Sequence, residues 1–187
     1  MANFAILASH NGSGFDAIYE ALKSKSLDIN IKIVISNNTN ATVLQKAEKY
    51  KIPNALVNTK TAKNPDEKIF ELLKEAQCEY IFLSGYMKKL SSKITENFKV
   101  INSHPSLLPH YGGTGMYGRF VHEAVIRDKQ KVSGVTIHEV NAIYDEGEII
   151  HQESLKLTKN ETVESLELKI KELEKETIIN GLKICLK

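Results

Sequence analysis

The chain has 187 residues, of which 42% are hydrophobic and 26% are charged, and its formal net charge at pH 7 is only +2. This composition is typical of a single ordinary globular domain over residues 1–187, and it excludes an intrinsically disordered chain. The nearly neutral charge, without a basic stripe, argues against nucleic acid as a partner, and no apolar run is long enough to span a bilayer.

Two cysteines, Cys78 and Cys185, lie far apart in a sequence with no apparent signal peptide. We expect both thiols to be reduced and buried as small hydrophobic side chains. A cytoplasmic location, with no membrane as a partner, follows from this expectation.

Apolar runs alternate with amphipathic segments in the first half of the chain. A helix start is clearest where Asn64 can act as a cap, Pro65 takes the first helical position and two acidic residues follow. Strands that alternate with helices and lack a polar face predict a mainly parallel sheet that is covered on both sides. The predicted strands are 3–7, 31–36, 55–57 and 80–83, and the predicted helices are 15–23, 42–50 and one that begins at 65.

The second half of the chain begins with the apolar run 98–101, which leads into a polar loop. Residues 132–140 and 148–157 predict two strands joined by the turn 141–147, and hence an antiparallel pair. Residues 162–186 carry apolar side chains at helical spacing and predict one long helix. The predicted fold class is therefore α/β, with a Rossmann-like, mostly parallel sheet, helices on both faces and an antiparallel strand pair near the C-terminal end.

Three loops are expected at the carboxyl edge of this sheet, where the ligands of parallel sheets bind. They comprise residues 11–14, 85–87 and 102–109, and a glycine-rich segment, 110–118, follows the third. We therefore expect three loops that are distant in sequence to converge on one crevice.

Asn102 and His104 are two positions apart, so an extended strand end presents both side chains on the same side. An Asn amide donates hydrogen bonds and a His titrates near physiological pH, so the pair can polarise a carbonyl group and transfer a proton. Asp145, within reach of His104, would raise the pKa of its ring and favour the imidazolium. A purely structural interpretation stays open, in which Asn102 and His104 brace a loop and Asp145 only forms a turn.

The turn Asn11-Gly12-Ser13-Gly14 joins the first predicted strand to the first predicted helix. Glycines let the backbone approach an anion, N–H groups at a helix start point toward it, and Ser13 adds a hydroxyl. The turn lacks the Lys of a Walker loop and the third glycine of a dinucleotide fingerprint. It predicts a phosphate site, with an ordinary strand-to-helix turn as the alternative.

Two other kinds of site use residues of the same region. His104, His110 and His138 are candidate metal ligands, but none has the short spacing of a metal motif, so no metal is expected. Ser106 is a candidate hydrolase nucleophile that lacks the surrounding Gly-x-Ser-x-Gly elbow. Glu174 lies on the last predicted helix, where its spacing alone indicates a boundary position.

The run Asn102-x-His104-Pro-Ser-Leu-Leu-Pro, the later Asp145 and the early Asn-Gly-Ser turn together resemble the phosphoribosylglycinamide formyltransferases of purine synthesis. The resemblance extends from the first predicted strand to the last predicted helix. It implies transfer of a formyl group from 10-formyltetrahydrofolate, a co-substrate, to the amine of 5'-phosphoribosylglycinamide. It also implies small-molecule partners, no metal, and a monomer or homodimer.

The resemblance implies roles for individual residues. Asn102, His104 and Asp145 would form the catalytic set, in which the first two stabilise an oxyanion. The turn 11–14 would hold the substrate phosphate, and Glu174 would bind its ribose hydroxyls. The implied folate pocket consists of Leu83, Met87, Lys88, Lys89, Leu90, Asn102 and Val140.

The sequence departs from the family pattern at several positions. Ser103 replaces an apolar residue between Asn102 and His104, Gly14 stands where the family often has Asn, and Lys88 and Lys89 replace an Arg and an aliphatic residue. Two alternative functions stay open. One is formyl transfer to another amine, such as that of an amino-sugar nucleotide, and the other is a non-catalytic domain that binds a phosphorylated ligand.

Overall fold

The computed structural model describes residues 1–187, which divide into two compact units. The first unit is Met1–Ile101, and the second is Asn102–Lys187. Each unit has its own strands and helices. A single domain over residues 1–187 stays a prediction.

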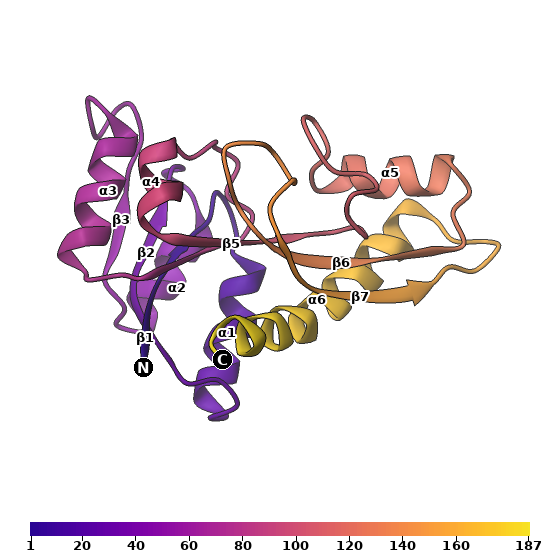
Figure 1. The fold of residues 1–187 in the computed structure, drawn as a ribbon, viewed down its shortest axis with the longest axis horizontal. Coiled ribbons are helices and arrows are strands. Elements are labelled where there is room, and N and C mark those ends of the chain that lie inside the picture. Colours follow the sequence, from indigo (N-terminus) through magenta and orange to yellow (C-terminus); the bar gives the residue numbers. More distant parts are fainter. The chain divides into compact units, whose positions relative to one another are not determined.

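The first unit is a parallel sheet whose strands are connected by helices (Figure 1). β1 is central, because it pairs in parallel with β2 on one side and with β4 on the other, and β2 pairs with β3. The strand order within this unit is therefore β3-β2-β1-β4. The elements are β1 (Ala2–Leu7), α1 (Ser13–Lys23), β2 (Ile29–Ser36), α2 (Thr42–Lys49), β3 (Asn54–Leu56), α3 (Pro65–Glu75), β4 (Tyr80–Leu83) and α4 (Ser92–Asn97).

Burial and capping explain these elements. The four residues 4–7 of β1 are fully buried, as expected for a parallel strand covered on both faces. α3 begins as predicted, because the side chain of Asn64 accepts a hydrogen bond from the backbone N–H of Glu67 and Pro65 follows the cap. The sequence did not predict α4, whose six residues include one buried side chain, Ile94, and therefore show no helical period.

The second unit combines an antiparallel strand pair with two helices. β5 (Lys99–His104) begins in the first unit, and its last three residues belong to the second. β6 and β7 pair in antiparallel orientation, with Gly134 opposite Ser154 and an irregularity between Ile137 and His138. The remaining elements are α5 (Arg119–Arg127), β6 (Val132–Glu139), β7 (Ile149–Lys156) and α6 (Val163–Cys185).

The long helix α6 packs against β6 and β7 (Figure 1). It begins with a capping box, in which Thr162 and Ser165 exchange hydrogen bonds between side chains and backbone. At Gly181 an added Cβ would lie 2.8 Å from the side chain of Ile137, so the helix backbone comes close to β6. With parallel strands in the first unit and this antiparallel pair in the second, the predicted α/β fold class is confirmed.

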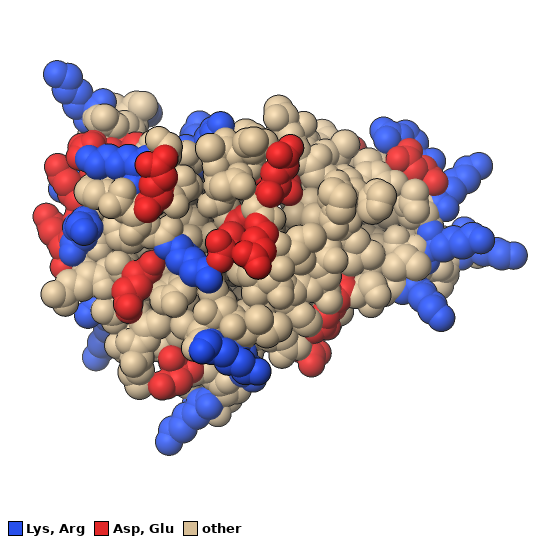
Figure 2. Space-filling model, viewed as in Figure 1, with Lys and Arg blue, Asp and Glu red and all other residues tan.

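The surface carries both signs of charge. On the face shown in Figure 2, basic and acidic side chains are mixed in small groups among neutral residues. None of the helices combines the length and the apolar composition needed to span a bilayer. Cys78 is buried, and burial raises the pKa of its thiol to about 11, but Cys185 in the last turn of α6 is only half-buried, so the prediction of two buried thiols is wrong for Cys185.

Replacement of Gly134 by Ala is expected to destabilise the protein. A Cβ at this position would lie 2.2 Å from the backbone oxygen of Glu153 and 2.5 Å from Cδ2 of Leu107, so the strand pair must shift. We expect Gly134→Ala to lower the free energy of unfolding in urea by about 1–3 kcal/mol, as other overpacked sites do. Ser154→Ala, at the exposed position opposite on β7, is the control and should change it by less than about 0.5 kcal/mol. Equal stability of the two variants would contradict this packing argument.

Candidate active site

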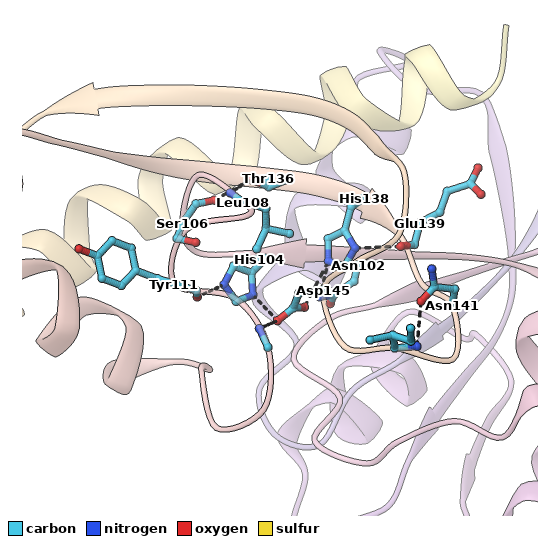
Figure 3. A network of polar contacts seen from close by, with 12 residues as sticks. Asn102, His104, Ser106, Leu108, Tyr111, Thr136, His138, Glu139, Asn141 and Asp145 are labelled. Atoms are coloured by element: carbon cyan, nitrogen blue, oxygen red, sulfur yellow. Dashed lines mark hydrogen bonds and ion pairs between the residues drawn. The ribbon is translucent and has the colours of Figure 1, made fainter.

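His104 ends β5 and is only 3% exposed. Its Nε2 lies 2.7 Å from the backbone oxygen of Tyr111 (Figure 3). A carbonyl oxygen can only accept a hydrogen bond, so Nε2 carries a proton and donates it. In the neutral ring, Nδ1 is therefore the unprotonated nitrogen and the position that can take up a second proton.

Asp145 faces this unprotonated nitrogen. Its Oδ2 lies 3.6 Å from Nδ1 of His104, and the same oxygen accepts a hydrogen bond of 2.8 Å from the backbone N–H of Gly113. Asp145 has a left-handed backbone (φ 58°) in the turn that precedes β7, and its side chain lies next to His104 (Figure 3). The carboxylate is thus tied to the glycine-rich segment and placed to stabilise a protonated His104.

Asn102 lies on the same side of β5 as His104 and contacts a second histidine (Figure 3). Nδ1 of His138 lies 2.8 Å from the backbone oxygen of Glu139, so that nitrogen is the donor and Nε2 is the acceptor. Nδ2 of Asn102 lies 3.1 Å from this Nε2 and donates to it. The bond fixes the orientation of the amide, and the second N–H of Asn102 is left to donate to a substrate oxygen.

Burial decides the protonation of both rings. Loss of solvent lowers the pKa of His104, and this effect outweighs the opposing effects of the Asp145 carboxylate and the Tyr111 carbonyl. Burial also lowers the pKa of His138. The sequence-based expectation that Asp145 gives His104 a raised pKa is therefore wrong in its net direction, because the cost of burying a charge was not visible in the spacing. His104 is neutral at pH 7.

A network of hydrogen bonds braces the loop that supplies the Tyr111 carbonyl. The hydroxyl of Thr136 on β6 accepts from the backbone N–H of Leu108 (3.0 Å) and donates to the backbone oxygen of Ser106 (2.6 Å). Gln152 on β7 donates to the backbone oxygen of Leu108 (2.9 Å). The position of the carbonyl therefore depends on side chains from both strands of the antiparallel pair.

The alternative sites proposed for this region find little support. Ser106 is 1% exposed and donates its hydroxyl proton to the backbone oxygen of His110 at 2.6 Å, which makes it a loop brace rather than a nucleophile. Among the described residues, no group of three or more His, Cys, Asp and Glu side chains is arranged to hold a metal ion.

Glu174 on α6 is also brought to β5. The hydroxyl of Ser103 donates to its Oε1 at 2.6 Å. Burial raises the pKa of the Glu174 carboxyl, while the bond from Ser103 and the charge of Lys171 lower it. The predicted substrate-binding residue Glu174 thus contacts the segment between Asn102 and His104.

The predicted phosphate turn lies in the first unit. Gly12 caps α1 with a left-handed backbone (φ 66°) and supplies no side-chain cap, while the backbone N–H of Phe15 in the first turn donates to the Ser84 hydroxyl at 3.2 Å. A Cβ at Gly12 would lie 2.6 Å from Cγ2 of Val43, so a glycine is needed both for the backbone angle and for space. The turn is braced by Lys46, whose Nζ donates to the backbone oxygen of Asn11 at 2.8 Å. The N–H groups of Ser13 and Gly14 at the start of α1 form no hydrogen bond within the protein and can bind an anion.

The predicted folate residues fall in both units. The backbone N–H of Met87 donates to the hydroxyl of Ser9 (2.7 Å), which holds the segment after β4. Met87 is 45% exposed, whereas Leu83 and Leu90 are buried. Val140 follows β6 in the second unit. Convergence of these residues and of the turn 11–14 on Asn102, His104 and Asp145 stays a prediction.

The sequence interpretation missed the supporting residues of the site. The role of the Tyr111 carbonyl has no signal in the sequence, because every residue has a backbone carbonyl. His138 was considered only as a metal ligand, although the alternation of residues 132–140 places it on the same strand face as Thr136. That periodicity was the one signal that could have assigned both residues to the site.

The chain thus folds as an α/β protein with an amide, a neutral imidazole and a carboxylate gathered at the end of one strand. The family model described as formyl transferase matches residues 2–182. The chain belongs to the formyl transferase family.

Within this family the chain is similar to the phosphoribosylglycinamide formyltransferases. It is 34% identical to that of Bacillus subtilis over 179 residues, which cover 93% of this chain and 89% of the relative. It is also 34% identical to that of Haemophilus influenzae, with 93% and 82% covered. The crystal structure of the phosphoribosylglycinamide formyltransferase from Bacillus halodurans matches with a TM-score of 0.89 at 30% identity, covering 99% of this chain and 95% of that one.

The buried histidines predict a loss of stability in acid. His122 on α5 is 3% exposed, its Nδ1 has no hydrogen-bond partner, and burial lowers its pKa, as it does for His104 and His138. Below pH 6.5, the ordinary pKa of histidine, the unfolded chain binds protons that the buried rings of the folded chain do not. The stability present above pH 6.5 is therefore lost as the pH falls below this value.

Urea denaturation between pH 8 and pH 5.5 measures this effect. We expect the free energy of unfolding to fall on acidification, and His122→Leu to show a weaker dependence on pH than the wild type. His10→Leu, at an exposed position, is the control and should keep the wild-type dependence. An identical pH dependence for the His122→Leu variant and the wild type would contradict the assignment.

Proposed function

We propose that this protein transfers the formyl group of 10-formyltetrahydrofolate to the amine of 5'-phosphoribosylglycinamide in de novo purine synthesis. The observation that carries the proposal is the arrangement of Asn102, neutral His104 and Asp145 around one strand end, in a chain similar to named phosphoribosylglycinamide formyltransferases. We also propose that the protein acts in the cytoplasm as a monomer or homodimer, with small molecules rather than nucleic acid as partners.

The proposed chemistry needs neither a metal nor a covalent enzyme intermediate. The amine nitrogen attacks the formyl carbon, and the electrons of the C=O bond move onto its oxygen. The N–H of Asn102 that does not bind His138 donates to this developing oxyanion. Nδ1 of His104 accepts the proton that the amine loses, and the Asp145 carboxylate, 3.6 Å away, stabilises the resulting imidazolium.

Collapse of the tetrahedral intermediate completes the reaction. The bond between the formyl carbon and N10 of the folate breaks, and the imidazolium of His104 returns its proton to N10. Tetrahydrofolate and the formylated amine are then released. This scheme gives His104 the role of a base that becomes an acid, which suits a ring whose pKa is lowered by burial.

The remaining residues are proposed to bind the two substrates, with residues 1–187 acting as one formyltransferase domain. The unblocked N–H groups of the turn 11–14 would hold the phosphate, and Glu174 would accept hydrogen bonds from the ribose hydroxyls. The proposed folate pocket consists of Leu83, Met87, Lys88, Lys89, Leu90, Asn102 and Val140.

A spectroscopic assay of tetrahydrofolate production tests the proposal. Product should form when 10-formyltetrahydrofolate and 5'-phosphoribosylglycinamide are both present, and not when the amine is omitted. Turnover with an amino-sugar nucleotide in place of the glycinamide substrate would favour the alternative acceptor. Binding of a phosphorylated ligand without turnover of any amine would favour a non-catalytic domain.

Loss of any one of the three central side chains should abolish most of the activity. We expect Asn102→Ala, His104→Ala and Asp145→Ala each to reduce kcat by about 10²-fold or more, because the first loses the oxyanion donor and the other two lose the proton acceptor or the charge that stabilises it. His151→Ala, a half-buried histidine on β7 paired with Glu153, is the matched control and should retain kcat within about twofold. Full turnover by a folded His104→Ala protein would disprove its role as the proton acceptor.

A further inference from the structure

Most acidic residues of α6 pair with a cationic side chain, and Glu174 is an exception. Glu167 pairs with Lys171 at 2.5 Å, Glu172 pairs with Lys175 at 2.6 Å, and Glu164 pairs with Arg119 at 2.6 Å. Glu174 forms no ion pair, and its hydrogen bond comes from a neutral hydroxyl. A buried carboxyl group without a cation is costly to ionise unless it is hydrogen-bonded, so the contacts of Glu174 bear directly on its charge.

Ser103 supplies that contact because of its place in the strand. Side chains alternate across a strand, so Ser103 points to the face opposite that of Asn102 and His104. α6 packs on this opposite face, where Gly181 approaches Ile137 of β6. Glu174 lies seven residues before Gly181 and therefore on the same side of the helix. An apolar residue at position 103 would offer the carboxylate no hydrogen bond.

The charge of Glu174 matters for what it can bind. A carboxylate accepts hydrogen bonds through both oxygens, whereas the protonated acid is a weaker acceptor. Oε1 of Glu174 is occupied by Ser103, and Oε2 forms no hydrogen bond within the protein. Oε2 is thus the atom through which Glu174 can accept from the hydroxyl of a ligand.

We propose that Ser103 is a positioning residue for substrate binding, which orients Glu174 so that Oε2 accepts a ribose hydroxyl of the amine substrate. The inference rests on the proposed function. It assigns to Ser103 a part in the recognition of the ribose, on the strand face opposite to that of Asn102 and His104.

Steady-state kinetics of Ser103→Ala test this inference. We expect KM for 5'-phosphoribosylglycinamide to rise about tenfold, because a hydrogen bond to a charged group is lost, while kcat and KM for the formyl donor stay within about twofold. Ser103→Thr keeps the hydroxyl on a strand that tolerates a branched side chain, and it should restore KM. An unchanged KM in Ser103→Ala, or an equal fall in kcat, would overturn the inference.

The charge of Glu174 can be measured without an activity assay. Carbon-13 NMR of the glutamate carboxyl groups, with Glu174→Gln to assign the signal, follows the titration of Glu174. Burial raises the pKa of Glu174, and the Ser103 hydroxyl on β5 and Lys171 on α6 are the groups that lower it. We expect the titration to move to higher pH in Ser103→Ala and to return toward the wild-type position in Ser103→Thr.

The two experiments separate failure of the inference from failure of the proposed function. A wild-type protein that does not formylate 5'-phosphoribosylglycinamide would disprove the proposed function, whatever the NMR titration shows. An active wild type with the same Glu174 titration and the same KM in Ser103→Ala would disprove the role of Ser103 alone.

Discussion

The hydrogen bond between His104 and the backbone carbonyl of Tyr111 sets the chemistry of the whole site. A carbonyl oxygen cannot donate, so the bond holds one proton on Nε2 and leaves the lone pair of Nδ1 directed at Asp145. If the carbonyl moved away, either nitrogen of the ring could carry the proton. The brace that Thr136 and Gln152 provide to the loop therefore helps to hold this carbonyl in place, although neither side chain forms a hydrogen bond with His104.

Opposing effects act on the pKa of His104, and their balance is suited to the proposed formyl transfer. Burial disfavours the charged ring, and the carboxylate of Asp145 favours it. A ring that was permanently charged could stabilise an oxyanion but could not accept the proton of the attacking amine. A neutral ring next to a carboxylate can accept the proton and then be stabilised in its charged form, so that one residue serves both halves of the reaction. In the proposed mechanism Asn102, which contacts His138, supplies the oxyanion donor separately.

The sequence was most informative where the chemistry is carried by side chains of a distinctive type. The pattern of Asn102, His104 and Asp145 predicted an amide, an imidazole and a carboxylate in one place, and the structure brings all three together within the second unit. It was less informative where backbone atoms act. The Tyr111 carbonyl, the N–H of Gly113 that binds Asp145, and the short helix α4 carry no distinctive residue type or period.

The α/β class, the family resemblance and the residue types of the site could be predicted from the amino-acid sequence, because hydrophobic period, turn residues and the Asn-x-His-Pro run are local features of the chain. The charge on His104, the orientation of the Asn102 amide and the pairing of Ser103 with Glu174 became visible only in the folded chain. These depend on burial and on partners contributed by β6, α6 and two loops. Such partners are distant in sequence, and their effect depends on the solvent they exclude, so no local pattern can reveal it.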